Sequence, residues 1–198
     1  MKYIKTFEKI SKTNPIIDSA KRGSVSGIEK AIKAGYDVNR GDDYNRTPLM
    51  VAVASNYISV VNCLIKNNAD VNLRDGGGRT ALMMANTSKI INILINAGAD
   101  VNIASNKGET AIMEYLRYHQ YESEKFIQYL ILFLEHGLDL DKTNNNGDNL
   151  YDLIKKYKES WTNSSSSYYN DIEEYMNKKY PKYKEYWDFK NDIQKYNV

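Results

Sequence analysis

The sequence predicts an all-α solenoid of stacked helix–turn–helix units, four to five of them, with helical caps at both ends. Three observations predict it: two short motifs that return together along the chain, helix-start and helix-end signals within each return, and turn-forming residues between them. The length of 198 residues suits a compact array with an added segment. A hydrophobic content of 42% is sufficient for a packed core.

The first segment, residues 1–13, has the pattern of a capping helix. Its apolar residues fall on one helical face: Tyr3, Ile4, Phe7 and Ile10. The terminal units of a solenoid need a polar outer face or a cap, and this segment can supply one. Charged residues recur every few positions, so the segment lacks the apolar run of a secretory signal.

Two motifs then return in parallel. Thr-Pro-Leu-Met-Val-Ala at 47–52 returns as Thr-Ala-Leu-Met-Met-Ala at 80–85, and more weakly at 110–113. Asp-Val-Asn stands at 37–39, 70–72 and 100–102, with Asp-Leu-Asp at 139–141, so the spacings are 33, 30 and 39 residues. The third unit is therefore short and the fourth is long. The predicted repeats run from 14 to 157, as units 14–46, 47–79, 80–109 and 110–148 and a degenerate fifth unit from 149.

Each unit carries the signals of two short helices. Thr47 followed by Pro48 is an N-cap residue with proline at the first helical position, where its missing N–H costs nothing. The second helix ends at a residue suited to the left-handed conformation, for which Asn is the usual substitute for Gly. In successive units these residues are Gly35, Asn68, Gly98 and Gly137. One helix pair cannot bury its apolar stripe alone, so the units must stack.

The pattern resembles the ankyrin repeat, whose consensus carries Thr-Pro-Leu-His, a mid-unit Gly and Gly-Ala-Asp-Val-Asn. The first unit fits when Asn14-Pro15 is aligned with Thr47-Pro48. Apolar side chains and one Asp replace the family's histidine, so we expect apolar stacking in place of its hydrogen bonds. The residues at this position are Ile17, Met50, Met83, Met113 and Asp152. The short third unit is expected to trim the turn between its helices, and the long fourth unit to extend that turn or its flanking helices.

Residues 158–198 depart from the repeat and form a Tyr-rich helical extension. A polar break at 164–167 precedes a helical pattern at 170–180, and an amphipathic segment follows Pro181. Its apolar residues most simply cover the exposed end of the fifth unit. The alternative interpretation is an aromatic docking surface for a partner.

The charge balance excludes several classes of function. With 27 basic and 25 acidic residues the net charge is +2, which gives no general attraction to nucleic acid or to anionic membranes. No apolar run is long enough to predict a membrane span. Cys63 is the single cysteine, so no internal disulfide can form and a reducing compartment is the natural location.

Side chains suited to catalysis or metal binding are few and scattered. We expect His119 at the surface, His136 as a cation at a helix end, and Cys63 in core packing. The glycines at 76–78 lack the Gly-Lys-Ser/Thr ending of a phosphate loop, so they predict a bare turn whose backbone a partner could approach. The sequence therefore predicts no catalytic residue, no cofactor and no metal.

The resemblance implies a protein partner, bound through the projecting turn tips and the exposed side of each first helix on the concave face. Tyr and Arg at these positions are the residue types that dominate interfaces. Carried onto this sequence, the predicted partner-binding residues are Tyr44, Arg46, Arg79, Asn106, Lys107, Glu109, Arg117 and Tyr118. Their charges are mixed, so neither a strongly acidic nor a strongly basic partner is predicted.

The sequence thus predicts a monomeric protein–protein interaction module that binds neither nucleic acid nor membrane. Its expected location is the cytoplasm, or a host cell if the source is a parasite or virus. The alternative is a regulatory or inhibitory subunit that acts through the aromatic C-terminal segment, with the repeats as a spacer. An enzyme ranks third.

Overall fold

The computed structural model describes residues 14–118, 123–160 and 178. The predicted N-terminal cap, His119 and nearly all of the C-terminal extension lie outside the described residues. The described elements are α2 (Pro15–Lys21), α3 (Val25–Lys33), α4 (Pro48–Ala54), α5 (Ile58–Lys66), the 3-10 turn η1 (Leu82–Met84), α6 (Ser88–Asn96), α7 (Ala111–Tyr118), α8 (Ser123–Glu135) and α9 (Leu150–Ser160). None of these helices is long and apolar enough to span a bilayer.

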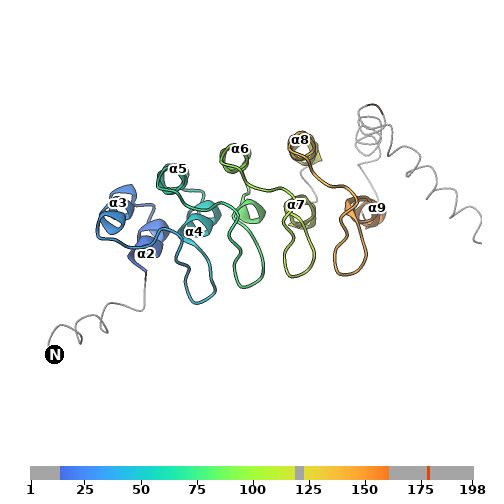
Figure 1. The fold of residues 1–198 in the computed structure, drawn as a ribbon. Helices are drawn as coiled ribbons and strands as arrows, with labels where there is room; N and C mark the ends of the chain where they lie inside the picture. Colours follow the sequence, from blue (N-terminus) through green and yellow to red (C-terminus); the bar gives the residue numbers. More distant parts are fainter. Residues whose placement is uncertain (1–13, 119–122, 161–177, 179–198) are drawn as a thin grey trace, which may run out of the picture.

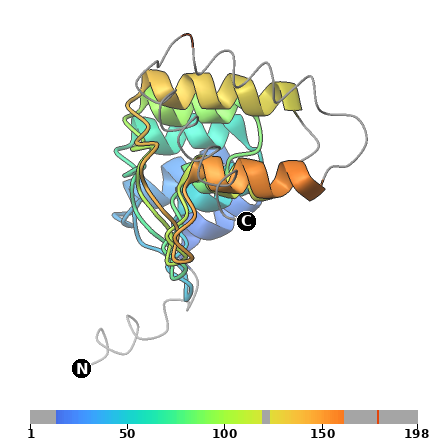
Figure 2. The ribbon, with the colours of Figure 1, turned by 90° about the vertical axis from the view of Figure 1, so that its right-hand side faces the viewer.

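The helices form two rows along a shallow arch (Figure 1). The inner row is α2, α4, η1, α7 and α9, and the outer row is α3, α5, α6 and α8. Each outer helix follows an inner one, and contacts between α2 and α4, α4 and η1, η1 and α7, and α7 and α9 make the inner row continuous. Seen along the stack, the loops all leave at the same end of the helices (Figure 2). The predicted all-α stack is confirmed.

The predicted helix boundaries have the expected local causes. The Thr47 hydroxyl accepts a hydrogen bond from the Met50 N–H at 3.2 Å, and the Asn14 side chain accepts one from the Ile16 N–H at 3.0 Å. Asn68, where the other units carry glycine, has a φ of 63°. Asn tolerates this left-handed backbone better than other non-glycine residues. These signals therefore open the inner helices of the first and second units and end α5, whereas η1 has no side-chain cap and the Thr110 hydroxyl before α7 has no hydrogen-bond partner among the described residues.

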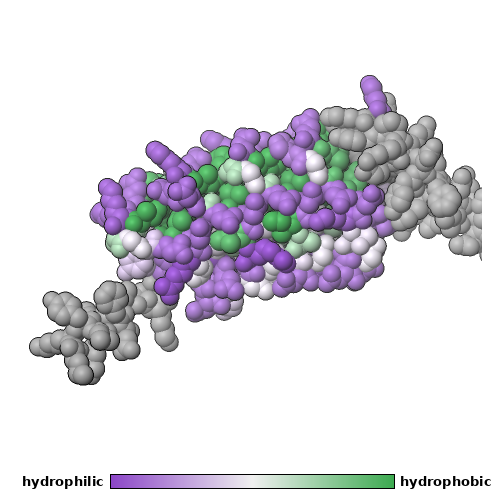
Figure 3. All heavy atoms as spheres, in the orientation of Figure 1, coloured by the Kyte–Doolittle hydropathy of each residue, from purple (hydrophilic) through white to green (hydrophobic). Residues whose placement is uncertain are grey.

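The core runs through all units as one cluster of buried apolar residues. Leu64 and Leu94 occupy the same place in successive outer helices and are fully buried. Three of the residues that replace the family's histidine, Ile17, Met50 and Met113, are also buried, in line with the expected apolar stacking. Figure 3 shows apolar residues in an interrupted band along the stack, bordered by hydrophilic ones.

The third unit differs from its prediction. The missing residues were expected to shorten the turn between the helices, but the inner helix itself is reduced to η1. In the second unit 11 positions separate the capping Thr47 from the start of α5 at Ile58, whereas eight separate Thr80 from the start of α6 at Ser88. With so few residues the chain must leave the inner row after a single turn to reach the outer row.

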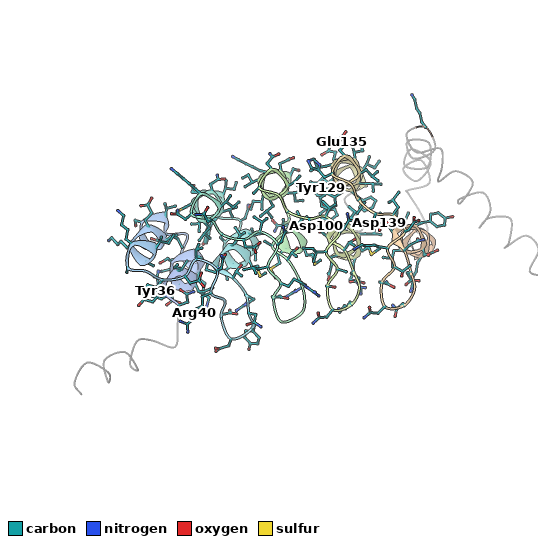
Figure 4. All side chains as sticks on the ribbon, viewed as in Figure 1. Tyr36, Arg40, Asp100, Tyr129, Glu135 and Asp139 are labelled. Atoms are coloured by element: carbon teal, nitrogen blue, oxygen red, sulfur yellow. The ribbon has the colours of Figure 1, made fainter. Side chains whose placement is uncertain are left out.

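The fourth unit follows its prediction, because its outer helix is longer. Helix α8 has 13 residues, whereas α5 and α6 have nine each. Tyr129 of α8, labelled in Figure 4, contacts the ring of Tyr115 edge-on, with 4.6 Å between ring centroids. Its hydroxyl lies 3.1 Å from the Ser88 hydroxyl of α6. Tyr129 thereby joins three neighbouring helices.

A ladder of asparagine side chains ties successive units together at the ends of the outer helices. The Asn72 amide accepts a hydrogen bond from the Asp100 N–H at 2.8 Å and donates one to the Gly98 carbonyl at 3.0 Å. Asn102 makes the equivalent pair of bonds to the Asp139 N–H and the Gly137 carbonyl, both at 2.8 Å. Each bridge needs one side chain that both accepts and donates, which an amide does and a carboxylate does not. Figure 4 shows Asp100 and Asp139 at corresponding places.

Candidate functional site

Four loops project from the inner side of the arch, and each closes in the same way (Figure 1). A backbone hydrogen bond joins the first residue to the fifth: Asp42 to Arg46, Asp75 to Arg79, Ser105 to Glu109, and Asn144 to Asp148, at 2.9–3.0 Å. The first side chain also accepts hydrogen bonds from backbone N–H groups across its own loop, as in an Asx turn. Residue identity at the first position therefore sets the shape of the loop.

The loop tips are also bonded to one another. The Gly76 N–H donates to the Tyr44 carbonyl at 2.8 Å, the Asn106 N–H to the Gly77 carbonyl at 2.9 Å, and the Asn145 N–H to the Lys107 carbonyl at 2.9 Å. The expected bare turn at 76–78 is thus corrected, since neighbouring loops already engage its backbone. Each of those carbonyl and N–H groups already makes a hydrogen bond within the stack.

The first two loops each hold an arginine by an aspartate. Asp42 receives hydrogen bonds from Nε and Nη2 of Arg46 at 2.9 and 2.7 Å, and Asp75 receives the same pair from Arg79 at 3.1 and 2.9 Å. Burial alone raises the pKa of Asp42, but the hydrogen bonds from the Arg46 side chain and backbone and from the Tyr44 backbone outweigh it, and the pKa is lowered. Both arginines are therefore fixed in direction.

Tyr44 is the most exposed large hydrophobic residue among the described residues, with 71% of its surface accessible. The Arg46 guanidinium lies over its ring, 5.4 Å from the centroid. Because Asp42 holds the guanidinium, the ring has a fixed support on one side. Tyr44 and Arg46 form a pre-oriented pair at the tip of the first loop.

The third loop is built differently. Ser105 takes the place of the aspartate and Glu109 that of the arginine, so no ion pair forms within the loop. Glu109 instead pairs with Arg117 of α7. The sequence analysis placed Glu109 at an exposed tip, and the structure buries it. Its side chain cannot face a partner directly, whereas that of Arg117 can.

The three ion pairs share one orientation. The side-chain exposures of arginine and carboxylate are 41% and 17% for Arg46 and Asp42, 47% and 3% for Arg79 and Asp75, and 35% and 2% for Arg117 and Glu109. In each pair the carboxylate is the more buried partner and the arginine side chain reaches the surface, although Nε of Arg117 is itself buried. A molecule that approaches this face meets three positioned guanidinium groups.

Other predicted site residues contribute less. Asn106 is exposed, but its side chain already accepts a hydrogen bond from Arg74 and donates one to the Gly76 carbonyl. Lys107 is exposed at its loop tip. The side chain of Tyr118 lies outside the described residues. Of the predicted set, the structure brings Tyr44, Arg46, Arg79, Lys107 and Arg117 to the loop side of the stack.

Sequence analysis missed Glu114, which lies on α7 where the second and third units carry Val51 and Met84. Its residue surface is only 5% exposed. Desolvation by burial raises its pKa, against the opposing effect of Lys107 and Arg79. The first unit carries Asp18 at the same position, so the sequence held only a weak signal for Glu114.

The side chains considered for chemistry remain apart. Cys63 is partly buried, and burial raises the pKa of its thiol. The His136 ring nitrogen Nδ1 lies 2.8 Å from the Leu132 carbonyl near the end of α8. Within 14–118 and 123–160, no three His, Cys, Asp or Glu side chains gather as a metal site would require.

Stacked helix pairs with a continuous core, joined by loops on one side, define a helical repeat solenoid with an extended contact face. The family model for ankyrin repeats matches residues 5–75 and 60–144. The chain belongs to the ankyrin-repeat family, whose members are generally protein-interaction modules rather than enzymes. No curated protein matches the chain.

Proposed function

We propose that this chain is an adaptor that holds a protein partner on its inner face, the surface formed by the inner helices and the loops. The common orientation of the three ion pairs carries this proposal. Stacking does not require an arginine there, because the fourth loop closes in the same way with Asp148 at that position. Outward-facing guanidinium groups instead suit contact with another molecule.

The inner face has the features of a pre-organised interface. Arg46, Arg79 and Arg117 are held by carboxylates, so little side-chain entropy is lost when a partner binds them. Tyr44 adds a large exposed ring on the same side. Since each guanidinium has a carboxylate behind it, its long-range field is small. Association should therefore depend only weakly on salt concentration.

The same proposal covers the partner class, the location and the oligomeric state. A protein partner, rather than nucleic acid or a membrane, agrees with the net charge of +2. A cytoplasmic location, or delivery to a host cell, agrees with the single Cys63. We propose a monomeric chain, which sedimentation velocity would test.

Affinity capture with the full chain as bait tests the proposed face. The bait variant Tyr44→Ala/Lys107→Ala removes two exposed tip side chains while leaving the ion pairs in place. The matched control, Asn62→Ala/Lys66→Ala, removes the same net charge from exposed positions of the outer helix α5. We expect the tip variant to bind the captured protein at least about tenfold more weakly, with the control unchanged. Equal capture by both variants would make the proposal wrong.

The alternative, a regulatory subunit that acts through its C-terminal aromatic residues, is tested with the same captured protein. The variant Tyr186→Ala/Trp187→Ala keeps the chain at full length. Loss of binding in this variant, together with normal binding by the tip variant, would favour the alternative. We expect the reverse pattern.

A further inference from the structure

The inner segment of the third unit is poorly buried. In the second unit, six of the seven residues of α4 are buried. Of the three residues of η1 only Leu82 is buried, and Met83 and Met84 are partly exposed. Apolar burial supplies much of the free energy that holds neighbouring units together. The third unit is therefore held less firmly in the inner row than the second unit is.

In the first two units, backbone hydrogen bonds close the turn after the inner helix. This turn contains a left-handed residue in both, Gly23 with a φ of 68° and Asn56 with a φ of 55°. In the second unit the Asn56 N–H donates to the Val53 carbonyl at 2.9 Å. The Tyr57 N–H donates to the carbonyl of residue 52 at 3.0 Å, which completes the closure.

The third unit lacks this closure. None of residues 82–88 has a positive φ, and the N–H groups of Asn86 and Thr87 donate no backbone hydrogen bond to any described residue. Neither η1 nor α6 is capped by a side-chain hydrogen bond at its start. The Thr87 hydroxyl, which precedes α6, instead bonds to the Asn56 side chain at 3.1 Å. A short 3-10 segment followed by an open turn is typical of a hinge.

The parts of the third unit around this segment are firmly held. Ile90 and Leu94 of α6 are fully buried. At the loop end, the side chain of Asn72 bonds to the chain that follows α6, and the Asn106 N–H bonds to the second loop. All loops leave at the same end of the helices (Figure 2). The third unit is thus joined at its loop end and open at the opposite end.

We propose that residues 82–88 form a joint at which the solenoid flexes, with the loop end as the pivot and α6 remaining folded. Segments open locally where few apolar contacts and few protected backbone hydrogen bonds hold them. Movement at this joint changes the angle between the first loop, which carries Tyr44 and Arg46, and the fourth unit, which carries Arg117. The inner face can thereby adjust its curvature to a partner. This use of the movement rests on the proposed function, whereas the joint itself does not.

Amide hydrogen exchange of the full chain, followed by NMR, tests the joint. Met84 and Ala85 donate backbone hydrogen bonds at 3.1 and 3.2 Å. Asn56 and Tyr57, whose N–H groups are bonded at the corresponding turn, are the matched control. After correction for intrinsic rates, we expect Met84 and Ala85 to exchange at least about tenfold faster than the control pair. Leu94 of α6 should stay protected.

An insertion that restores the missing residues gives a second test. Aligned on the second unit, the third unit lacks the counterparts of residues 53–55, and Asn86 matches Asn56. Val-Ala-Ser inserted between Ala85 and Asn86 restores the pattern and lets Asn86 close the turn. Exchange at the joint should slow by about tenfold or more, whereas the same insertion within the polar run 164–167 should leave it unchanged. Fast exchange in a folded insertion variant would contradict the missing residues as the cause.

The remaining outcomes separate the joint from the proposed function. Equal exchange at residues 84–85 and 56–57 of the free chain would overturn the joint. Fast exchange at Leu94 together with Met84 would also overturn it, because the whole unit would then unfold.

The protein captured on the inner face tests the link to binding. Its binding should slow exchange at Met84 and Ala85 by at least about threefold, because a bound joint opens less often. Protection of the loop tips alone would overturn this link and leave the proposed function standing. Normal capture by the tip variant would overturn the proposed face, and exchange in the free chain would still decide whether the joint exists.

Discussion

Removing the Arg117 side chain should lower the free energy of unfolding, because it leaves the buried Glu109 carboxylate without its cation. The substitution Arg117→Met keeps most of the aliphatic volume and deletes the charge that pairs with Glu109. Breaking a fully buried ion pair from one side costs about 3–5 kcal/mol. Because 35% of the Arg117 side chain is exposed, water can reach part of the vacated site, and we expect roughly 2–3 kcal/mol instead. The expected loss corresponds to a fall in melting temperature of about 5–10 °C.

Thermal and urea unfolding, followed by circular dichroism for a double-mutant cycle, checks the reasoning. The partner substitution Glu109→Gln removes the buried charge, so Glu109→Gln/Arg117→Met should be more stable than Arg117→Met alone. Glu29→Gln/Arg117→Met, which changes an exposed glutamate instead, should show no such rescue. A coupling energy below about 0.5 kcal/mol between positions 109 and 117 would refute the argument.

Four further changes test other parts of the structure. Asn72→Ala removes the hydrogen bonds to the Asp100 N–H and the Gly98 carbonyl. It should lower the free energy of unfolding by about 1–3 kcal/mol and speed amide hydrogen exchange at Asp100. Unchanged exchange at Asp100 would contradict the role of the asparagine ladder. Gly78→Ala adds a Cβ to a residue with a φ of 75°, and this Cβ would lie 2.7 Å from the Asn106 backbone nitrogen. In a urea titration it should lower the free energy of unfolding by at least about 1 kcal/mol more than Gly77→Ala does, and equal effects would contradict this. Asp42→Asn can keep the backbone bonds, as Asn144 does, but weakens the hold on Arg46. Since folding lowers the pKa of Asp42, the wild type should be more stable than Asp42→Asn at neutral pH, and this difference should vanish as the pH falls through the acid range. Thermal melts at several pH values measure it, and a difference that stays constant with pH would contradict the prediction. Glu114→Met places an apolar residue there, as in the second and third units. Because folding raises the Glu114 pKa, the variant should be more stable at pH 7 by about 1 kcal/mol, with less gain in acid; a less stable variant would contradict it.

The repeat architecture was predictable because its signals are local. An N-cap at Thr47, proline at the first helical position and a left-handed residue at Asn68 each act within a few residues. Their return at a regular spacing then fixes the stack, since one pair of helices cannot bury its apolar face alone. The structure adds the groups that these residues contact and leaves the residues at the helix ends where the sequence placed them.

The shortened third unit could not be placed from such signals. Thr80-Ala81-Leu82 still has the pattern of a helix start, and nothing local shows that the chain must leave the row at Met84. The limit is set by distance, because the outer helix begins at Ser88 and the chain must cross between rows before it. A deletion shows that residues are missing, and the packing decides which element loses them.

The residues of the candidate face also divide into those that the sequence could place and those that it could not. Exposure of Tyr44 follows from its place at a loop tip, and the sequence was sufficient to select it. The burial of Glu109 depends on two other changes, Ser105 in its own loop and Arg117 one helix away. Such pairings join positions that sequence spacing alone does not relate, so they become visible only in three dimensions.

Stacking and partner recognition are carried by different residues of the same loops. The asparagine ladder and the tip-to-tip backbone bonds consume the groups that hold neighbouring units together, including Asn72 and Asn106. Arg46 and Arg79 make no bond that stacking needs, because Asn144 and Asp148 close the fourth loop without an arginine. Arg117 differs, because it also pairs with the buried Glu109. Selection on the partner could therefore change Arg46 and Arg79 while the ladder stays fixed, and this separation lets one scaffold hold a specific protein without rebuilding its core.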